Sequence, residues 1–126
     1  MLSNGFPKTE HLVSRAAVER LFSQGSAGVT VYPLRAVFRQ VQEETGPVRV
    51  LISVSKRHFK HAVDRNRAKR QVREAYRLQK HVLWEALERK GMQLEVAFVW
   101  LSDEPQDSRK VMRAMQYLLQ KILLKL

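Results

Sequence analysis

Apolar and polar positions along the chain predict helices at both ends and in the middle, with strands between them. His11 to Phe22 carries apolar residues at helical spacing and is followed by Gly25, so we expect a short first helix there. Val29–Val41 alternates apolar and polar side chains, which is typical of a strand with one face on a core. The stretch is also long enough for two short strands bent near Pro33.

The second half of the chain continues with clearer patterns. Val48–Ser55 alternates again and predicts a strand, and Ala62 to Lys90 forms the longest helical pattern, closed by a glycine. Leu94–Leu101 is apolar on both faces, as expected of a central strand, and Asp107 or Ser108 can cap a last helix. The order α-β-β-β-α-β-α predicts an α+β fold, a single-domain sandwich in which helices pack on a small mixed sheet.

The length and composition fit this reading. The chain has 126 residues, of which 44% are hydrophobic, so we expect one domain over residues 1–126, with residues 1–8 a flexible N-terminal segment. The sequence has no cysteine, which excludes a disulfide scaffold and thiol chemistry. Its start lacks the apolar core of a secretory signal, and no apolar run approaches the length of a membrane helix. We therefore expect a soluble, cytoplasmic protein.

The charge is strongly basic and unevenly distributed. The formal net charge is +11, which makes a polyanion the expected partner, either nucleic acid or an anionic membrane. The window from Lys56 to Lys80 holds ten basic residues against two acidic ones, so about a fifth of the chain carries +8 of that charge. The uneven distribution of charge thus predicts a binding surface in this part of the chain.

Helical geometry separates this window into two faces. Asn66, Arg70, Arg73, Arg77 and Lys80 follow a spacing of four and three residues and form one polar stripe. The opposite face is apolar and rich in Ala and Val, which suits packing on a sheet better than insertion into a membrane. Arginine outnumbers lysine five to one in the first half of the helix, and its planar guanidinium binds phosphates bidentately. These features favour nucleic acid over lipid and over an ordinary solvated face.

The candidate catalytic groups form no recognisable site. The histidines are His11, His58, His61 and His81, and the pair spaced three apart is surrounded by basic residues, which disfavours a metal pair. The carboxylates show no spacing of a two-metal nuclease, and the five glycines are too scattered for a phosphate-binding loop. We expect no catalytic residue, no metal ligand and no stand-alone enzyme.

Two adjacent segments carry a specific resemblance. Ile52–Arg57 reads I-S-V-S-K-R, and Ala62–Arg77 reads A-V-D-R-N-R-A-K-R-Q-V-R-E-A-Y-R. Together they resemble the bacterial ribonuclease P protein component, whose members have S-V-S-K-[KR] at the end of a strand and A-V-x-R-N-R-x-K-R-x-x-R-E-x-[FY]-R on the next helix. The first helix is also similar to the family pattern, with matches at Leu12, Val18, Leu21, Phe22 and Gly25.

The resemblance implies a subunit of a ribonucleoprotein that removes the 5′ leader from precursor tRNA. The large RNA would be the catalyst, with magnesium ions bound to it, and the protein would bind that RNA and the single-stranded leader. It also implies a left-handed β-α-β crossover, against the usual rule. The resemblance and the polar stripe together predict these RNA-binding residues: Lys56, Arg57, Lys60, Arg65, Asn66, Arg67, Lys69, Arg70, Arg73, Arg77 and Lys80. Arg65 and Arg67 fall outside the stripe, so they either reach RNA by another edge or brace the start of the helix.

The sequence departs from the family pattern at two places. The loop His58–His61 is one residue longer than usual and lacks a glycine that the family often has there. The leader cleft of the family tends to use two aromatic residues on the first helix, but the first position here is Val18, which leaves Phe22. Phe38 or Tyr32 could supply a second ring from a strand, and Phe22 itself could equally be a core residue. We expect Phe22, Val18 and Phe38 to line the cleft.

Two other functions remain open at this point. A non-enzymatic RNA-binding protein, such as a ribosomal one, would show the same charge on a similar fold. A DNA-binding module is less compatible, because the basic helix follows a strand and not the short turn of a helix-turn-helix pair. We expect the protein to be a monomer outside the holoenzyme.

Overall fold

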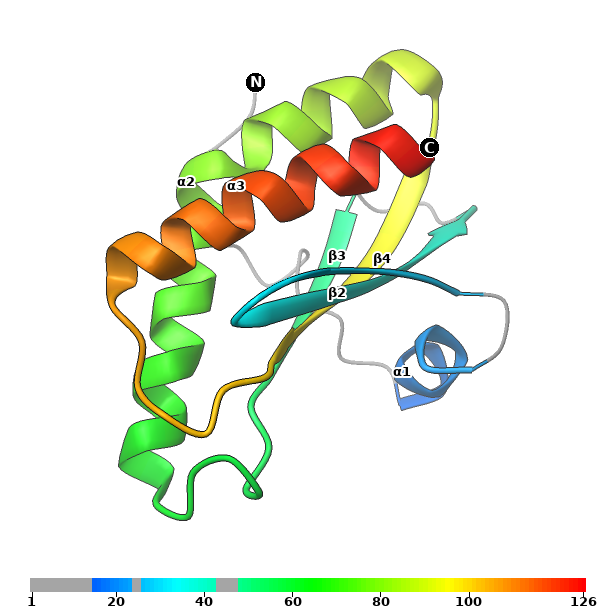
Figure 1. Ribbon diagram of the computed structural model, residues 1–126. Coiled ribbons are helices and arrows are strands. Elements are labelled where there is room, and N and C mark those ends of the chain that lie inside the picture. The colour runs from blue at the N-terminus through cyan, green and yellow to red at the C-terminus, as the bar shows by residue number, and fades with distance from the viewer. Residues whose placement is uncertain (1–14, 24–25, 43–47) are drawn as a thin grey trace.

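The computed structural model describes residues 15–23, 26–42 and 48–126. In chain order the elements are α1 (Arg15–Leu21), β1 (Ala27–Val31), β2 (Leu34–Val41), β3 (Val48–Ser53), α2 (Ala62–Lys90), β4 (Gln93–Trp100) and α3 (Ser108–Lys125). This order confirms the expected α+β class and the sequence α-β-β-β-α-β-α (Figure 1). The part of the first predicted helix before Arg15 and the N-terminal segment lie outside the described residues.

The long alternating stretch is two strands and not one. β1 and β2 form an antiparallel hairpin through Tyr32 and Pro33, whose peptide bond is cis. Along β2 the residues Leu34, Ala36 and Phe38 are buried, as the alternation predicts. The bend at Pro33 therefore divides the stretch into the edge strand β1 and its neighbour β2.

The four-stranded sheet has the order β1-β2-β4-β3 and is mixed. β4 lies between β2, to which it is antiparallel, and β3, to which it is parallel. Because β4 is paired on both edges and covered on both faces, nearly all its residues are buried, as expected from its apolar sequence. β3, α2 and β4 form the β-α-β crossover, and its left-handed sense stays a prediction.

Helices cover the sheet on both faces (Figure 1). α2 and α3 lie together over one face, where the large apolar core includes Phe98, Trp100 and Tyr76. α1 lies on the other face, where Ala17 and Leu21 pack against Ala97 in a smaller cluster. We call this second side of the sheet the α1 face.

The ends of the two long helices follow from local sequence. α2 ends at Gly91, which has φ 63° and ψ 31°, a left-handed conformation that glycine adopts without steric cost. α3 begins after Asp107, whose carboxylate accepts a hydrogen bond from the Arg109 backbone N–H at 2.8 Å. This bond and the nearby Arg109 side chain hold the pKa of Asp107 below its ordinary value.

Candidate RNA interface

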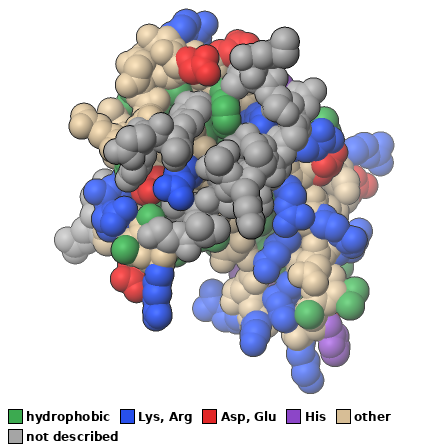
Figure 2. All heavy atoms as spheres, turned by 180° about the vertical axis from the view of Figure 1, so that it is seen from behind, with side chains coloured by type: hydrophobic (Ala, Val, Ile, Leu, Met, Phe, Trp, Pro, Cys, Tyr) green, Lys and Arg blue, Asp and Glu red, His purple; other side chains and the backbone are tan. Residues whose placement is uncertain are grey.

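The predicted RNA-binding residues gather on the first half of α2 and on the loop before it. We call this set the basic surface. Its exposed members are Lys56, Arg57, Lys60, Asn66, Arg67, Arg70 and Arg73, and Lys69 is half-buried beside them. Figure 2 shows Lys and Arg side chains clustered at the lower right, the end of the molecule where α2 begins. Such a cluster of exposed cations is suited to neutralising several phosphates at once.

The loop of residues 54–61, which we call the basic loop, is built on a compact turn. The backbone N–H groups of His58 and Phe59 both donate to the Ser55 carbonyl, and the Arg57 N–H donates to Ser55 Oγ at 3.1 Å. Phe59 is buried, with its ring centroid 6.1 Å from that of Trp100. Within the described residues no amino acid other than glycine has a positive φ, so no position of this loop requires a glycine.

Arg65 supports this loop from the start of α2, as one of the two alternatives left by the sequence expects, and its contact with RNA stays a prediction. Its guanidinium Nη1 donates to the carbonyl oxygens of Phe59 at 2.8 Å and Lys60 at 3.0 Å. Arg65 lies on the same side of α2 as the buried Ala68 and Val72, which explains why it falls outside the polar stripe. Arg67, by contrast, is exposed and available to a partner.

Arg77 belongs to the polar stripe but has a carboxylate partner one turn away. Its guanidinium forms an ion pair with Glu74, and Nε donates to Oε2 at 3.0 Å. The hydrogen bond between them lowers the pKa of Glu74 and raises the pKa of Arg77 from their ordinary values. The pair reduces the charge that Arg77 offers to a polyanion.

The expectation that Lys80 binds RNA is wrong for this fold, because its side chain is only 1% exposed. Its ammonium lies 4.9 Å from the centre of the Trp84 ring, within the range of a cation–π contact. The buried face of α2 is rotated toward Tyr76 and Leu87, and Lys80 is the stripe member nearest to that face. The same rotation leaves Val82 more than half exposed.

A cleft of about 430 Å³ opens on the α1 face of the sheet. It lies between the end of α1 and strands β1, β2 and β4. The cleft is lined by Leu21, Phe22, Ser23, Ser26, Ala27, Arg35, Val37, Val99 and Leu101. Val99 pairs with Ser53, the last residue of β3, so the cleft lies at the end of the sheet from which the basic loop departs.

The three residues predicted to line a leader cleft lie in different environments. Phe22 is 50% exposed at the cleft rim, so it is not a core residue and its ring is accessible. Val18 is half-buried and packs against the small cluster beneath α1. Phe38 is 4% exposed and points into the core under α2 and α3, so the expectation that it lines the cleft is wrong. Tyr32 is exposed, with the Lys110 ammonium 5.1 Å from its ring centre.

Arg35 is a cleft residue that sequence reasoning missed. It alternates with buried Leu34 and Ala36, so it projects from the opposite face of β2, and its guanidinium lies across β1. A Cβ at Gly28 would lie 2.8 Å from Arg35 Nη2, so the absent side chain at this glycine makes room for the arginine. The alternation predicted an outward-facing arginine, but only the pairing of β1 with β2 reveals that it overhangs a cleft.

The same face carries a buried charge that the sequence pattern did not reveal. Glu95 is fully buried on β4, directly between Arg39 on β2 and Arg49 on β3. Neither carboxylate oxygen has a hydrogen-bond partner among the described residues, although the strand register places an arginine on each side of Glu95. Cross-strand register, which sequence alone does not determine, places these three residues in one row.

Two further features bear on function. Within residues 15–23, 26–42 and 48–126, no group of three or more His, Asp or Glu side chains is placed to hold a metal ion. None of the helices that the structure describes is both long and apolar enough to cross a membrane.

Comparison with solved structures places this fold among known proteins. The Staphylococcus aureus RNase P protein matches with a TM-score of 0.72 and 18% identity, over 90% of this chain and 94% of that one. The RNase P protein from Thermotoga maritima matches with a TM-score of 0.69 and 21% identity, over 89% and 96%. At these identities the likeness concerns the fold.

Sequence comparison carries the assignment further. The family model described as Ribonuclease P matches residues 6–123. The ribonuclease P protein component of Porphyromonas gingivalis strain ATCC 33277 is 46% identical over 113 residues, which cover 89% of this chain and 82% of that protein. The corresponding protein of Chlorobaculum tepidum is 44% identical over 88 residues, 68% of this chain and 57% of that protein. The chain belongs to the ribonuclease P protein family and is therefore a protein component of the ribonuclease that processes the 5′ end of tRNA.

Proposed function

We propose that the basic surface binds the RNA subunit of ribonuclease P and that the cleft on the α1 face holds the 5′ leader of precursor tRNA. The observation that carries the proposal is the placement of the two features. The exposed cations of the basic loop and of α2 begin where β3 ends, and the cleft is lined by β4 beside that strand end. One RNA on the basic surface and a single strand in the cleft would thus meet at one end of the sheet.

The chemistry of each surface suits its proposed ligand. The basic surface offers arginine guanidinium groups, which bind phosphate oxygens bidentately. The cleft offers an exposed aromatic ring, Phe22, apolar walls and the guanidinium of Arg35. An aromatic ring beside a cation is the combination that binds single-stranded nucleic acid without requiring base pairs.

Within this proposal the protein supplies no catalytic residue. The RNA subunit would cleave the precursor with magnesium ions bound to it, and the protein would lower the repulsion between the two RNAs and position the leader. Residues 1–126 would act as a single RNA-binding domain and as a monomer outside the holoenzyme. A cytoplasmic location would follow, because precursor tRNA is made there in bacteria.

The test is processing of a precursor tRNA by the cognate RNA subunit at low magnesium, with and without the protein. We expect cleavage at the mature 5′ end to accelerate with protein concentration and to saturate. The matched substrate is the same precursor with its leader shortened to one nucleotide, which should gain less from the protein. Absence of stimulation at every protein concentration would contradict the proposal and favour a general RNA-binding role.

A further inference from the structure

The basic loop is fastened to a second loop, which begins where β4 ends. β3 and β4 are parallel neighbours, so the segments that follow them leave the same end of the sheet side by side. The segment after β3 is the basic loop, and residues 101–107 follow β4. This second segment contains Asp103, Glu104 and Asp107, and we call it the acidic loop.

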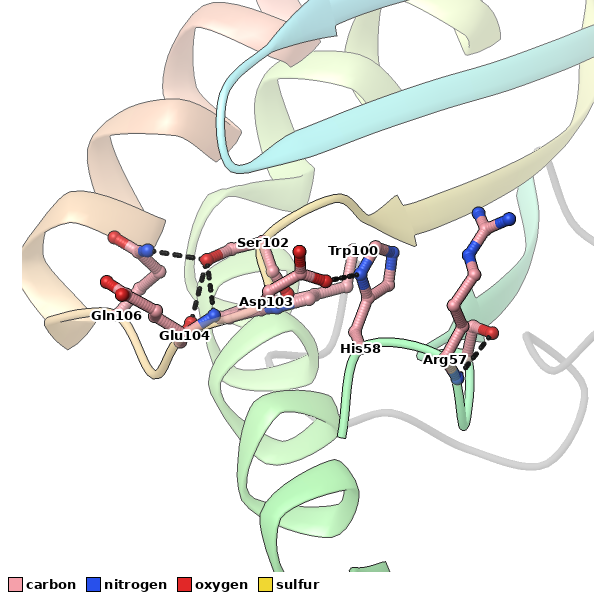
Figure 3. A network of polar contacts seen from close by, with 8 residues as sticks. Arg57, His58, Trp100, Ser102, Asp103, Glu104 and Gln106 are labelled. Atoms are coloured by element: carbon pink, nitrogen blue, oxygen red, sulfur yellow. Dashed lines mark hydrogen bonds and ion pairs between the residues drawn. The ribbon is translucent and has the colours of Figure 1, made fainter. Parts of the chain in front are cut away.

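A side-chain hydrogen bond joins the two loops directly. His58 Nδ1 lies 2.7 Å from Asp103 Oδ1, and Figure 3 marks this contact with a dashed line. The His58 side chain is only 12% exposed, whereas that of Asp103 is 80% exposed. The imidazole is therefore enclosed by protein, and the carboxylate reaches it from a solvated position.

The acidic loop is itself held in place by hydrogen bonds to the buried Ser102. Ser102 is buried, and its Oγ donates to the Glu104 carbonyl at 2.8 Å and accepts from the Glu104 N–H at 3.0 Å (Figure 3). Gln106 Nε2 also donates to Ser102 Oγ, at 2.8 Å, and Trp100 Nε1 donates to the Ser102 carbonyl at 2.9 Å. The backbone next to Asp103 is thus held in place by the hydrogen bonds around Ser102.

The basic loop is also held by the buried Phe59 ring, which packs near Trp100, and by backbone contacts near its two ends. At its start, hydrogen bonds to Ser55 form a turn, and near its end Arg65 donates to the carbonyls of Phe59 and Lys60. Between them, the exposed Lys56 and Arg57 depend on the position of the turn that ends at His58. A fixed turn keeps these cations at one spacing before RNA arrives, which avoids the entropy cost of ordering them on binding.

We propose that Asp103 is a positioning residue for RNA binding: through its contact with His58 it holds the basic loop, and so Lys56 and Arg57, in the RNA-binding conformation. The inference rests on the proposed function, because it concerns the same basic surface. A carboxylate beside a phosphate-binding surface repels the ligand, so a purely electrostatic role would make Asp103 unfavourable for binding. Removal of the Asp103 carboxylate should therefore weaken RNA binding if Asp103 positions the loop, and tighten it if the role is purely electrostatic.

The chain offers a matched control for this charge. Glu104 is the next residue in the same loop, is exposed, and contributes to the Ser102 network through its backbone only. Glu104→Ala removes the same charge as Asp103→Ala and leaves the contact with His58 intact. Both positions are exposed, so both variants should fold, which thermal unfolding followed by circular dichroism will verify.

The experiment measures equilibrium binding of each variant to the RNA subunit of ribonuclease P across a salt series. We expect Glu104→Ala to bind as tightly as the unaltered protein or more tightly. Asp103→Ala should bind about three- to tenfold more weakly, as expected when one or two side chains must be ordered on binding. Asp103→Asn keeps an oxygen that accepts from the ring N–H, so it should bind more tightly than Asp103→Ala.

Two results would overturn the inference. One is that Asp103→Ala tightens binding to the same extent as Glu104→Ala, which is the electrostatic outcome. The other is equal RNA affinity of Asp103→Asn and Asp103→Ala. That result would mean that the loss of affinity does not depend on the hydrogen bond to His58. If the unaltered protein does not bind the RNA subunit, the proposed function itself fails, so the two failures are distinguishable. In a His58→Ala background the loss from Asp103→Ala should disappear.

Discussion

The most informative test of the basic surface compares two residues of the polar stripe, one exposed and one buried. Arg73 is exposed on α2, whereas Lys80, two turns further along, is buried against Trp84. Each phosphate that a protein cation neutralises contributes roughly 0.9 to the slope of log affinity against log salt. Arg73→Ala should therefore reduce the slope by about 0.9, which amounts to about a 3.5-fold smaller loss of affinity between 50 and 200 mM salt.

Lys80→Met removes the same unit of charge but should leave the slope unchanged, because a buried ammonium contacts no phosphate. Methionine retains an unbranched side chain of similar length, so it serves as the matched control for charge. The assay is filter binding of the ribonuclease P RNA subunit at four or more salt concentrations, with Arg70→Ala as a second exposed variant. Equal slopes for the unaltered protein and Arg73→Ala, or a reduced slope for Lys80→Met, would refute the assignment.

Four further predictions follow from single contacts. Glu74→Gln removes the ion pair with Arg77 and one negative charge, so RNA binding should tighten and its salt slope should steepen by up to about 0.9; a weaker-binding variant would contradict this. Phe22→Ala should weaken binding of a leader-bearing precursor by about 1–3 kcal/mol, the usual contribution of one base stacked on an aromatic ring, and leave binding of mature tRNA unchanged. Gly91→Ala should lower the free energy of unfolding by about 1 kcal/mol in urea denaturation, because alanine is strained at φ 63°, and Gly91→Asn should lower it less. Asp107→Ala should destabilise the protein at neutral pH. Because the pKa of Asp107 is lower in the folded state, this deficit should shrink as the pH falls below the ordinary aspartate range, and a pH-independent deficit would exclude the charged cap.

Much of the fold could be predicted because its elements have strong local signals. The helix Ala62–Lys90 was bounded correctly by its periodicity and by a glycine that takes a left-handed conformation. Apolar residues on both faces indicate the central strand, and the sequence offers Asp107 or Ser108 as the cap of the last helix, of which the structure has Asp107. The family was recognisable from a motif that joins a strand end to the start of the basic helix.

The errors arose where burial depends on packing between elements. Phe38 and Phe22 are both aromatic residues in amphipathic segments, but one faces the large core and the other faces the rim of a cleft. Helical spacing places Lys80 in the polar stripe, because spacing gives the angular position of a residue around the helix and does not show which neighbouring elements cover it. How far around α2 the buried face extends is decided by what packs against it, including the bulky Tyr76 and Leu87.

The sequence by itself determined most of the secondary structure, the family and the part of the chain that carries the charge, because these depend on residue identity and on spacing along one segment. Tertiary structure alone decided which cations remain exposed, that Arg35 overhangs a cleft, and that Glu95 lies between Arg39 and Arg49. It also brought Asp103 to His58, 45 residues earlier in the chain. Contacts of this kind follow from strand order and register, which bring together residues whose separation in sequence carries no local signal.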